Sequence, residues 1–379
     1  MNKKLHILFL CSWLPSRVRP TDGDFIFRHA QAISTLQNVS IVHVITDESL
    51  KENYELNIFT KDDINIYIGY LKKFTNPLVK MWFYFKIYKL LIRKVGIFNL
   101  IHVNVTYPSG LIALFYKIFY KKKYIVSEHW TDYEFPLNKK IKPLRKLFTK
   151  LIIRKADLVC PVSYELENAM ISFGLKGKYK VISNVIDTKI FIPKKTIKRN
   201  SKFTLVHISN LYNPQKNIFG ILNVIKRLSE LRDDFVFKII GNGDPTEFLA
   251  YKKNLGLTDQ IVQFEPGKEH KDIAAIYQNA DLYVSFSNYE TFGIVLAEAI
   301  ACGTPVVATN TGIAGELDKF NCKIIDVGDE DALLDAIQYH LNLNSPIDTK
   351  TMHNEIKRLY SINTIANSFS NQYNNILKN

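Results

Sequence analysis

Short apolar runs alternate with longer mixed stretches along the whole chain, and this alternation is typical of a parallel α/β architecture. In the first half, the apolar runs predict buried strands at 5–11, 39–46, 99–104, 123–128, 157–162 and 179–183. The stretches between them predict helices, among them 24–36, 76–95, 108–121 and 140–155. A second series of strands is predicted at 203–209, 235–240, 260–264, 281–286, 304–308 and 322–327.

The two series are separated by a polar and charged stretch, Pro193–Ser201, which predicts a linker. A chain of 379 residues is long for one domain and suits two domains of ordinary size. We therefore expect two doubly wound, Rossmann-like domains with parallel sheets, at 1–190 and 202–360. A last helix, predicted at about 361–377, has one apolar stripe and an Asn-rich outer face.

Charge is distributed unevenly between the two halves. The formal net charge is +14, but residues 1–185 contain 29 Lys and Arg against 14 Asp and Glu, a net of +15. Such asymmetry indicates an anionic partner that meets only the first half, and nucleic acid and a membrane surface both qualify. Large apolar and aromatic residues lie among the basic ones, and this favours the membrane. No apolar run reaches the ~18 residues of a spanning helix.

Two further features indicate the cellular compartment. Residues 5–11 follow two lysines and resemble a signal peptide, but the run is short, contains His6 and lacks a small-x-small cleavage site. We interpret it as the first buried strand. The four cysteines each lie in or beside an apolar run and fit buried free thiols in a reducing cytoplasm: Cys11, Cys160, Cys302 and Cys322.

The segment from Asn288 to Thr309 carries the densest chemical signal and predicts a strand, a loop, a helix, a turn and another strand. Glu290 lies in the loop and Glu298 two turns into the helix. A carboxylate at position 298 is surrounded by apolar residues, so it needs polar partners such as ribose hydroxyl groups. The alternative is a glutamate on a solvated helix face. The helix N-terminus suits a diphosphate and is formed by Thr291, Phe292, Gly293, Ile294 and Val295.

The two glutamates, followed by Ala-x-x-x-Gly-x-Pro-Val-Val-Ala over 299–308, resemble the signature of the family-four retaining glycosyltransferases of the bacterial surface-polysaccharide type. The resemblance implies the GT-B fold, in which two Rossmann-like domains face each other across a cleft. Residues 1–190 would then bind the acceptor and 202–360 the nucleotide-sugar donor. The terminal helix at 361–379 resembles the one that braces the N-terminal domain. Further segments match in the same order, at 15–25, 156–163, 184–191, 240–243 and 312–316.

The resemblance also implies roles for single residues. Glu298 would hold the donor ribose, Glu290 the hydroxyl groups of the transferred sugar, and the backbone of 292–295 the diphosphate and sugar. Lys216 matches the lysine that neutralises the donor diphosphate, and His129 the histidine that reaches the donor sugar near the reacting centre. The catalytic residues would therefore be His129 and Glu290. Three glycines complete the donor-binding set, the last of them near the nucleobase: Gly23, Gly241 and Gly267.

One position departs from the family pattern. The family usually has an arginine six residues before the lysine, whereas this chain has Asn210, which we keep in the donor-binding set. Asparagine can donate a hydrogen bond but has neither a fixed charge nor a bidentate fork, so the strength of diphosphate binding is in doubt. For His129 and for His102, which both lie at strand ends, a purely structural role is the alternative.

The implied reaction is transfer of a sugar from a UDP- or GDP-sugar to a hydroxyl group of a glycan, with retention of anomeric configuration. No residue is an assured covalent nucleophile, so we expect front-face displacement that depends on positioning and electrostatic stabilisation. Neither a metal nor a cofactor beyond the co-substrate is expected. The chain lacks the glycine fingerprint of nicotinamide enzymes and the Gly-Lys-Ser/Thr of P-loop ATPases. A catalytically inactive GT-B scaffold or binding protein and a GT-B sugar epimerase stay open as alternatives.

Two basic amphipathic stretches, 72–95 and 137–155, predict a membrane-facing surface. The alternative is that both are solvated faces of ordinary helices. We expect the first domain to dock on the anionic cytoplasmic leaflet and to meet a lipid-linked acceptor there, a polyprenyl-diphosphate glycan, with no nucleic acid as partner. This would serve surface polysaccharide or lipopolysaccharide synthesis. The residues expected to contact the membrane or acceptor are Lys139, Lys140, Lys142 and Arg145.

Overall fold

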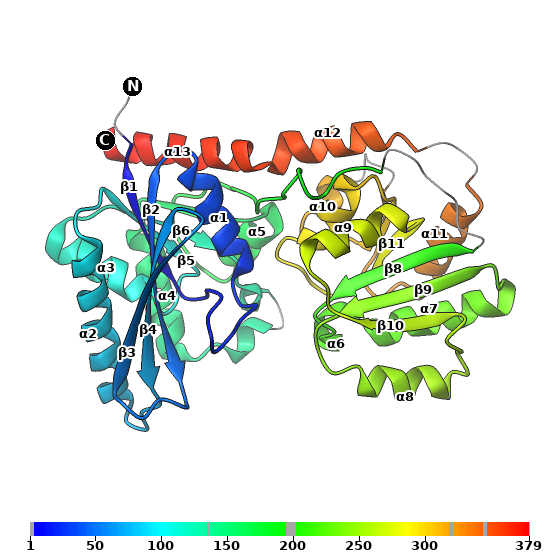
Figure 1. Ribbon diagram of the computed structural model, residues 1–379, viewed down its shortest axis with the longest axis horizontal. Helices are drawn as coiled ribbons and strands as arrows, with labels where there is room; N and C mark the ends of the chain where they lie inside the picture. Colours follow the sequence, from blue (N-terminus) through cyan, green and yellow to red (C-terminus); the bar gives the residue numbers. More distant parts are fainter. Residues whose placement is uncertain (1–3, 135–136, 195–201, 318–321, 344–346, 379) are drawn as a thin grey trace. The chain divides into compact units, whose positions relative to one another are not determined.

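The protein divides into two compact units, one of Met1–Val185 with Ile362–Asn379 and one of Ile186–Ser361 (Figure 1). Each unit has its own sheet, with helices packed on its faces. Residues 186–190, which we predicted in the first domain, belong to the second unit, and 195–201 of the predicted linker lie outside the described residues. The computed structural model describes residues 4–134, 137–194, 202–317, 322–343 and 347–378.

The sheet of the first unit has the strand order β3-β4-β2-β1-β5-β6-β7. All neighbouring strands are parallel except β3 and β4, which are antiparallel. The order of the parallel strands reverses between β1 and β5, and ligands bind at such switch points in open α/β sheets. The strands are β1 (His6–Cys11), β2 (Asn38–Asp47), β3 (Tyr54–Lys61), β4 (Ile64–Lys72), β5 (Leu100–Asn104), β6 (Tyr124–Glu128) and β7 (Leu158–Pro161).

The first unit departs from the sequence prediction at two places. The segment 179–183 runs beside β7, with the N–H groups of Lys180 and Ile182 donating to the carbonyl groups of Val159 and Pro161, but it forms only an isolated bridge, Tyr179 to Val159, and no strand. The hairpin of β3 and β4 was not predicted. Its turn has positive φ at both Asp62 and Asp63, a conformation that aspartate tolerates and that joins antiparallel strands tightly.

The four predicted helices of the first half are confirmed to within three residues at each end. The last helix of the chain also belongs to the first unit and packs on its first helix (Figure 1). Its apolar stripe is buried there, with the Phe369 ring 5.3 Å from the ring of His29. The helices are α1 (Asp24–Ser34), α2 (Pro77–Val95), α3 (Gly110–Tyr120), α4 (Pro143–Lys155), α5 (Tyr164–Ser172) and α13 (Ile362–Lys378), with short 3-10 turns at Thr131–Tyr133 and Leu137–Lys140.

The second unit has a fully parallel sheet in the order β10-β9-β8-β11-β12-β13, so its switch point lies between β8 and β11. The six predicted strands are confirmed to within two residues at each end, and side chains such as Leu205, Ile239 and Val284 are fully buried. The strands are β8 (Phe203–Ser209), β9 (Phe235–Gly241), β10 (Val262–Pro266), β11 (Leu282–Ser285), β12 (Val306–Thr309) and β13 (Cys322–Ile325).

Helices connect these strands and cover the sheet (Figure 1). Among the residues that the structure describes, no helix of either unit is both long and apolar enough to cross a membrane. The helices of the second unit are α6 (Asn213–Lys216), α7 (Ile218–Leu231), α8 (Thr246–Asn254), α9 (His270–Asn279), α10 (Ile294–Ala301), α11 (Glu330–Leu341) and α12 (Thr349–Tyr360), with a 3-10 turn at Ala314–Glu316.

Candidate functional site

The loop between β11 and α10 places one glutamate at the switch point of the second unit. Glu290 is buried, and its Oε1 accepts hydrogen bonds from the ammonium group of Lys216 and, at 2.9 Å, from the hydroxyl group of Ser287. Its Oε2 accepts a third bond from Gln215, at 3.2 Å. Lys216 ends the short helix that follows β8, so two predicted residues 74 positions apart meet as an ion pair whose side chains are each 11% exposed.

The helix after this loop begins later than predicted. Gly293 is the N-cap, with φ of 81°, and α10 starts at Ile294, so Thr291 and Phe292 belong to the loop and not to the helix N-terminus. No acidic residue lies in the first turn, so nothing there opposes an anion at the positive end of the helix dipole. The first turn of α10, with Val295, therefore keeps the character that suits a diphosphate.

Gly312, which lies in the matching segment 312–316 but was given no role from the sequence, holds this loop in place. Gly312 has φ of 62°, and an added Cβ would lie 2.6 Å from the carbonyl oxygen of Phe292. The same carbonyl accepts a hydrogen bond from the backbone N–H of Ile313, at 3.0 Å. Phe292 itself is buried, and its ring packs edge-on against Tyr360. Any larger residue at position 312 would push the loop away from this position.

Glu298 lies in the second turn of α10, as predicted, and is only 3% exposed. This excludes the alternative of a glutamate on a solvated helix face. It engages at least one partner within the chain, as a buried carboxylate must. Its negative charge also adds to the effect of burial in raising the pKa values of Tyr277 and Cys302.

Asn210, at the position of the family arginine, has an exposed side chain that turns back on its own loop. Its Oδ1 accepts a hydrogen bond from the backbone N–H of Tyr212, at 3.2 Å, which shapes the chain between β8 and Lys216. The side chain supplies no second cation beside Lys216. Among the described residues, the Glu290 carboxylate therefore faces one lysine and no arginine.

Each of the three predicted glycines has a packing reason of its own. An added Cβ would lie 2.8 Å from the backbone of Trp13 at Gly23, 2.4 Å from that of Ser209 at Gly241, and 2.0 Å from the Asn242 side chain at Gly267. Gly23 is also the N-cap of α1, with φ of 75°. Close approach of backbone explains Gly23 and Gly241, and close approach of a side chain explains Gly267, while the roles of all three in donor binding stay predictions.

In the first unit, His129 follows β6 directly and is 5% exposed. Neither ring nitrogen has a hydrogen-bond partner among the described residues, and the ring lies 4.6 Å from that of Phe25 and 5.4 Å from that of His29. Burial, and after it the neighbouring His29 and His102, hold the pKa of His129 well below its usual range. The imidazole is therefore neutral, with one donor and one acceptor nitrogen that no described residue satisfies.

The residue before His129 was missed in the sequence. The carboxylate of Glu128 is fully buried and accepts hydrogen bonds from the backbone N–H groups of His129 at 2.9 Å and Trp130 at 3.0 Å. It also accepts from the Tyr133 hydroxyl group at 3.1 Å and from the backbone N–H and hydroxyl group of Thr106. Glu128 therefore fixes the turn that carries His129. The only sequence signal is a charged residue at the end of an apolar strand.

The surroundings of His102 support the alternative of a purely structural role. Its Nδ1 lies 2.7 Å from the Tyr373 hydroxyl group and its Nε2 lies 2.7 Å from the Ser127 hydroxyl group. The side chain is fully buried, and burial lowers its pKa well below the usual range. Both nitrogens are thus satisfied inside the core of the first unit, where His102 ties α13 to the sheet.

The four basic residues predicted for the membrane differ in their surroundings. Lys139, Lys140 and Lys142 are exposed. The guanidinium group of Arg145, by contrast, stacks 3.7 Å from the centre of the Trp130 ring. Large apolar side chains are exposed on the helices that carry the basic residues, with Leu144 and Leu147 on α4 and Leu78 and Trp82 on α2.

Comparison with known proteins gives matches over both units. Residues 38–190 match the model "Glycosyltransferase Family 4" and residues 188–358 match "Glycosyl transferases group 1". An uncharacterized glycosyltransferase of Methanocaldococcus jannaschii is 25% identical over 87% of this chain and 88% of its own length. The N-acetyl-alpha-D-glucosaminyl L-malate synthase of Bacillus anthracis is 25% identical over 63% of this chain and 65% of its own length. Among solved structures, HepE of Anabaena in complex with UDP superposes with a TM-score of 0.77 at 17% identity, over 98% of this chain and 100% of that one.

Proposed function

Because the chain is a glycosyltransferase of the GT-B fold, we propose that it transfers a sugar from a nucleotide-diphosphate sugar to a hydroxyl group of a glycan, with retention of anomeric configuration. The observation that carries the proposal is the buried pair of Glu290 and Lys216 at the switch point of the second unit. Lys and Glu are rarely buried except as such pairs, and this pair lies at the edge where ligands bind in open α/β sheets.

The second unit has groups that suit the diphosphate, the transferred sugar and the ribose of the donor. The ammonium group of Lys216 and the N-terminus of α10 would neutralise the diphosphate. Glu290 would then exchange its bond with Lys216 for bonds with the hydroxyl groups of the transferred sugar. Glu298, buried two turns into α10, would accept hydrogen bonds from the ribose.

We propose a UDP- or GDP-sugar as donor, and HepE, which resembles this fold, has been solved with UDP. No divalent metal is needed on this view, because the lysine and the helix dipole already oppose the charge of the leaving diphosphate. The reaction would proceed by front-face displacement. His129 would bind a substrate hydroxyl group through its unpartnered ring nitrogens.

The acceptor is proposed to be lipid-linked, and the enzyme to work as a peripheral protein at the cytoplasmic leaflet in surface polysaccharide or lipopolysaccharide synthesis. Support comes from the net charge of +15 over residues 1–185 and from the exposed apolar side chains beside the lysines of α2 and α4.

Donor hydrolysis tests the proposal. The purified chain is incubated with UDP-, GDP- and ADP-sugars, and release of nucleotide is compared with that of Glu290→Ala and of Glu247→Gln, an exposed residue of α8. We expect one donor to be hydrolysed by the wild type and by the control and far more slowly by Glu290→Ala. An inactive scaffold would release no nucleotide with any donor, with or without acceptors, and an epimerase would isomerise the sugar.

A further inference from the structure

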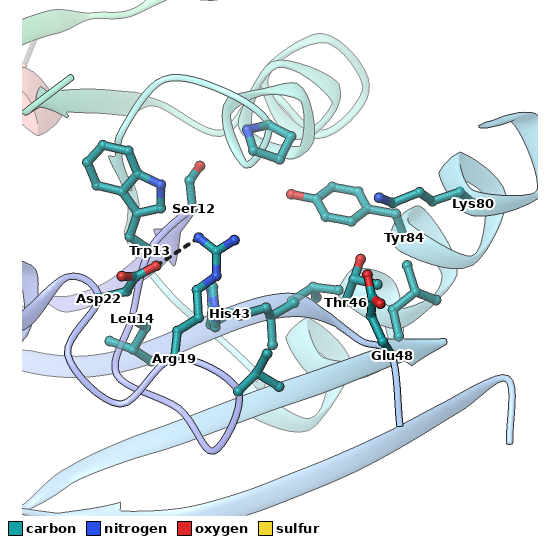
Figure 2. A pocket seen from close by; sticks show the side chains of 15 residues that line it. Ser12, Trp13, Leu14, Arg19, Asp22, His43, Thr46, Glu48, Lys80 and Tyr84 are labelled. Carbon is teal, nitrogen blue, oxygen red and sulfur yellow. Dashed lines mark hydrogen bonds and ion pairs between the residues drawn. The ribbon is translucent and has the colours of Figure 1, made fainter. Parts of the chain in front are cut away.

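The first unit contains a cavity of about 480 Å³ beside the loop of Gly23, since Trp13, whose backbone lies against Gly23, is part of its lining. It lies at the carboxyl ends of β1, β2 and β4 and is bounded on one side by the first turns of α2. Figure 2 shows Tyr84 and Lys80 extending from α2 toward the space beside Trp13 and Arg19. This size falls within the range of about 300–1,000 Å³ that small-ligand sites occupy.

One wall of the cavity contains a buried histidine with an unused nitrogen. His43 is 1% exposed, and its Nδ1 lies 2.8 Å from the backbone carbonyl oxygen of Cys11. A carbonyl oxygen only accepts, so Nδ1 carries the proton and Nε2 is the acceptor of a neutral ring. Nε2 has no partner among the described residues. A hydroxyl group of a ligand would satisfy it, since unpaired buried acceptors are unfavourable.

The charges around the cavity leave one cation uncompensated. Arg19 is paired with Asp22 at 3.0 Å, and Glu48 is paired with Lys73 at 2.9 Å. The ammonium group of Lys80 has no partner in the part of the chain that the structure describes. The cavity therefore offers a free positive charge at its mouth, which suits a phosphate group, and lysine binds phosphate as a point charge.

The same helix carries apolar surface away from the cavity. Leu78 is 78% exposed and Trp82 is 59% exposed, in the turns of α2 that also provide Lys80 and Tyr84. A ligand whose polar head lies in the cavity could thus continue along an apolar surface. Trp13 and Tyr84 add amphipathic rings inside the cavity, and such rings combine apolar contact with a polar tip.

We propose that this cavity binds the acceptor and that the acceptor is a phosphate-bearing sugar head. A sugar hydroxyl group donates to Nε2 of His43, the phosphate contacts Lys80, and an attached apolar chain follows the exposed side chains of α2. The inference rests on the proposed function, since it names the acceptor of that transfer.

Matched synthetic ligands test this assignment. Decyl diphosphate-linked glucose, galactose and N-acetylglucosamine are compared by titration calorimetry, below their micelle concentrations, with the corresponding neutral decyl glycosides. We expect at least one diphosphate compound to bind at least tenfold more tightly than its neutral counterpart. Lys80→Gln removes this advantage, whereas Lys89→Gln, exposed on the same helix outside the cavity, retains it.

A second variant tests the hydroxyl contact. His43→Asn keeps a donor for the Cys11 carbonyl group and removes Nε2, so it weakens the diphosphate compound and its neutral counterpart alike, by about fivefold. If His43→Asn does not fold, Lys80→Gln, which changes an exposed residue of the same cavity, still decides the assignment.

Equal affinity of the paired ligands, no binding by any of them, or equal effects of Lys80→Gln and Lys89→Gln would overturn the assignment. The failure of the inference stays separate from that of the proposed function. If the wild type turns over a donor but binds none of these ligands as expected, only the acceptor-site assignment is refuted. If the wild type turns over no donor, the proposed function is refuted.

Discussion

The carboxyl edges of the two sheets satisfy their polar side chains in opposite ways. In the second unit, Glu290 is held by Lys216, Gln215 and Ser287, so opposite charges are paired and fixed before any ligand is considered. In the first unit, His129 and His43 are buried as neutral rings with nitrogens that no described residue contacts. At this edge the second unit thus holds a buried ion pair, whereas the first holds, besides the hydrogen-bonded carboxylate of Glu128, neutral rings with unused hydrogen-bonding capacity.

The largest difference between the two units should be the loss of folding stability on acidification. Burial lowers the pKa of His29 and of His43 to about 4 and holds the pKa values of His102 and His129 well below their usual range, so these rings stay neutral in the folded protein. Because the unfolded chain binds protons at these sites first, stability falls as pH drops below about 6.5, by about 1.4 kcal/mol per histidine at pH 5.5.

In the second unit, only His207 among the described residues is fully buried with its pKa lowered to about 4. Hydrogen exchange at pH 7 and 5.5 should therefore show the larger loss of protection in β1, β5 and β6, and a smaller one in β8 and β11. Equal losses of protection in the two sheets would contradict the proposed difference between the two units.

Substitution of the paired carboxylate should produce the next largest effect. Glu290→Ala leaves Lys216 without its partner and the sugar without an acceptor group, so we expect kcat to fall by about a hundredfold or more, about 2.7 kcal/mol. Glu298→Gln should instead raise the donor KM, because a neutral amide accepts ribose hydroxyl groups less well. Steady-state kinetics of both variants check this, and near-normal values for both would refute the site.

Membrane binding tests the outer surface of the first unit. Lys139, Lys140 and Lys142 are exposed, so changing all three to Glu should lower partitioning to anionic liposomes about a hundredfold, at about 1 kcal/mol per charge removed. Arg145 is left intact because its stacking on Trp130 would confuse charge with folding. The matched control changes three exposed lysines of the second unit to Glu: Lys253, Lys271 and Lys350. Similar losses in the two triple variants would remove the case for a docking face.

Neutralising the carboxylate of Glu128, which fixes the turn that carries His129, should lower the free energy of unfolding by about 2 kcal/mol. Glu128→Gln replaces an acceptor-only group with an amide whose NH₂ faces the N–H groups of His129 and Trp130. Denaturant unfolding of the variant, compared with the exposed control Glu52→Gln, measures the difference. An unchanged midpoint would mean that the turn holds without Glu128.

Chelation should have the smallest effect, namely none. If Lys216 and the first turn of α10 neutralise the diphosphate, donor turnover persists in EDTA. Loss of activity that magnesium or manganese restores would show that the charges of the second unit are insufficient.

The second unit was the easier one to predict, and the reason is local. Glu290, the start of α10 and Glu298 lie within one strand-loop-helix segment, so their spacing fixes their relative positions. Besides the nearby Ser287, the partners of Glu290 come from 74 and 75 positions away, and no pattern along the chain indicates Gln215 as one of them.

The cavity of the first unit depends even more on tertiary structure. His43 and Lys80 become neighbours of one space only through the strand order β4-β2-β1, which short-range periodicity does not specify. The β3–β4 hairpin escaped prediction because Asp62-Asp63 is a weaker turn signal than a pair with glycine. Glu128 was overlooked because most of its hydrogen-bond donors are backbone N–H groups, which leave no signal in the sequence.

The place of α13 in the first unit has a consequence for the order in which the chain matures. A ribosome delivers Ile186–Ser361 before the last helix, so the second unit is available in full while the first still lacks the segment that packs on α1. Until Phe369 and Tyr373 emerge, the rings of His29 and His102 have no cover on that side. The first half of the chain is therefore the last to receive all its residues, and a released chain that ends at residue 361 would contain every residue of the second unit but lack the helix that completes the first.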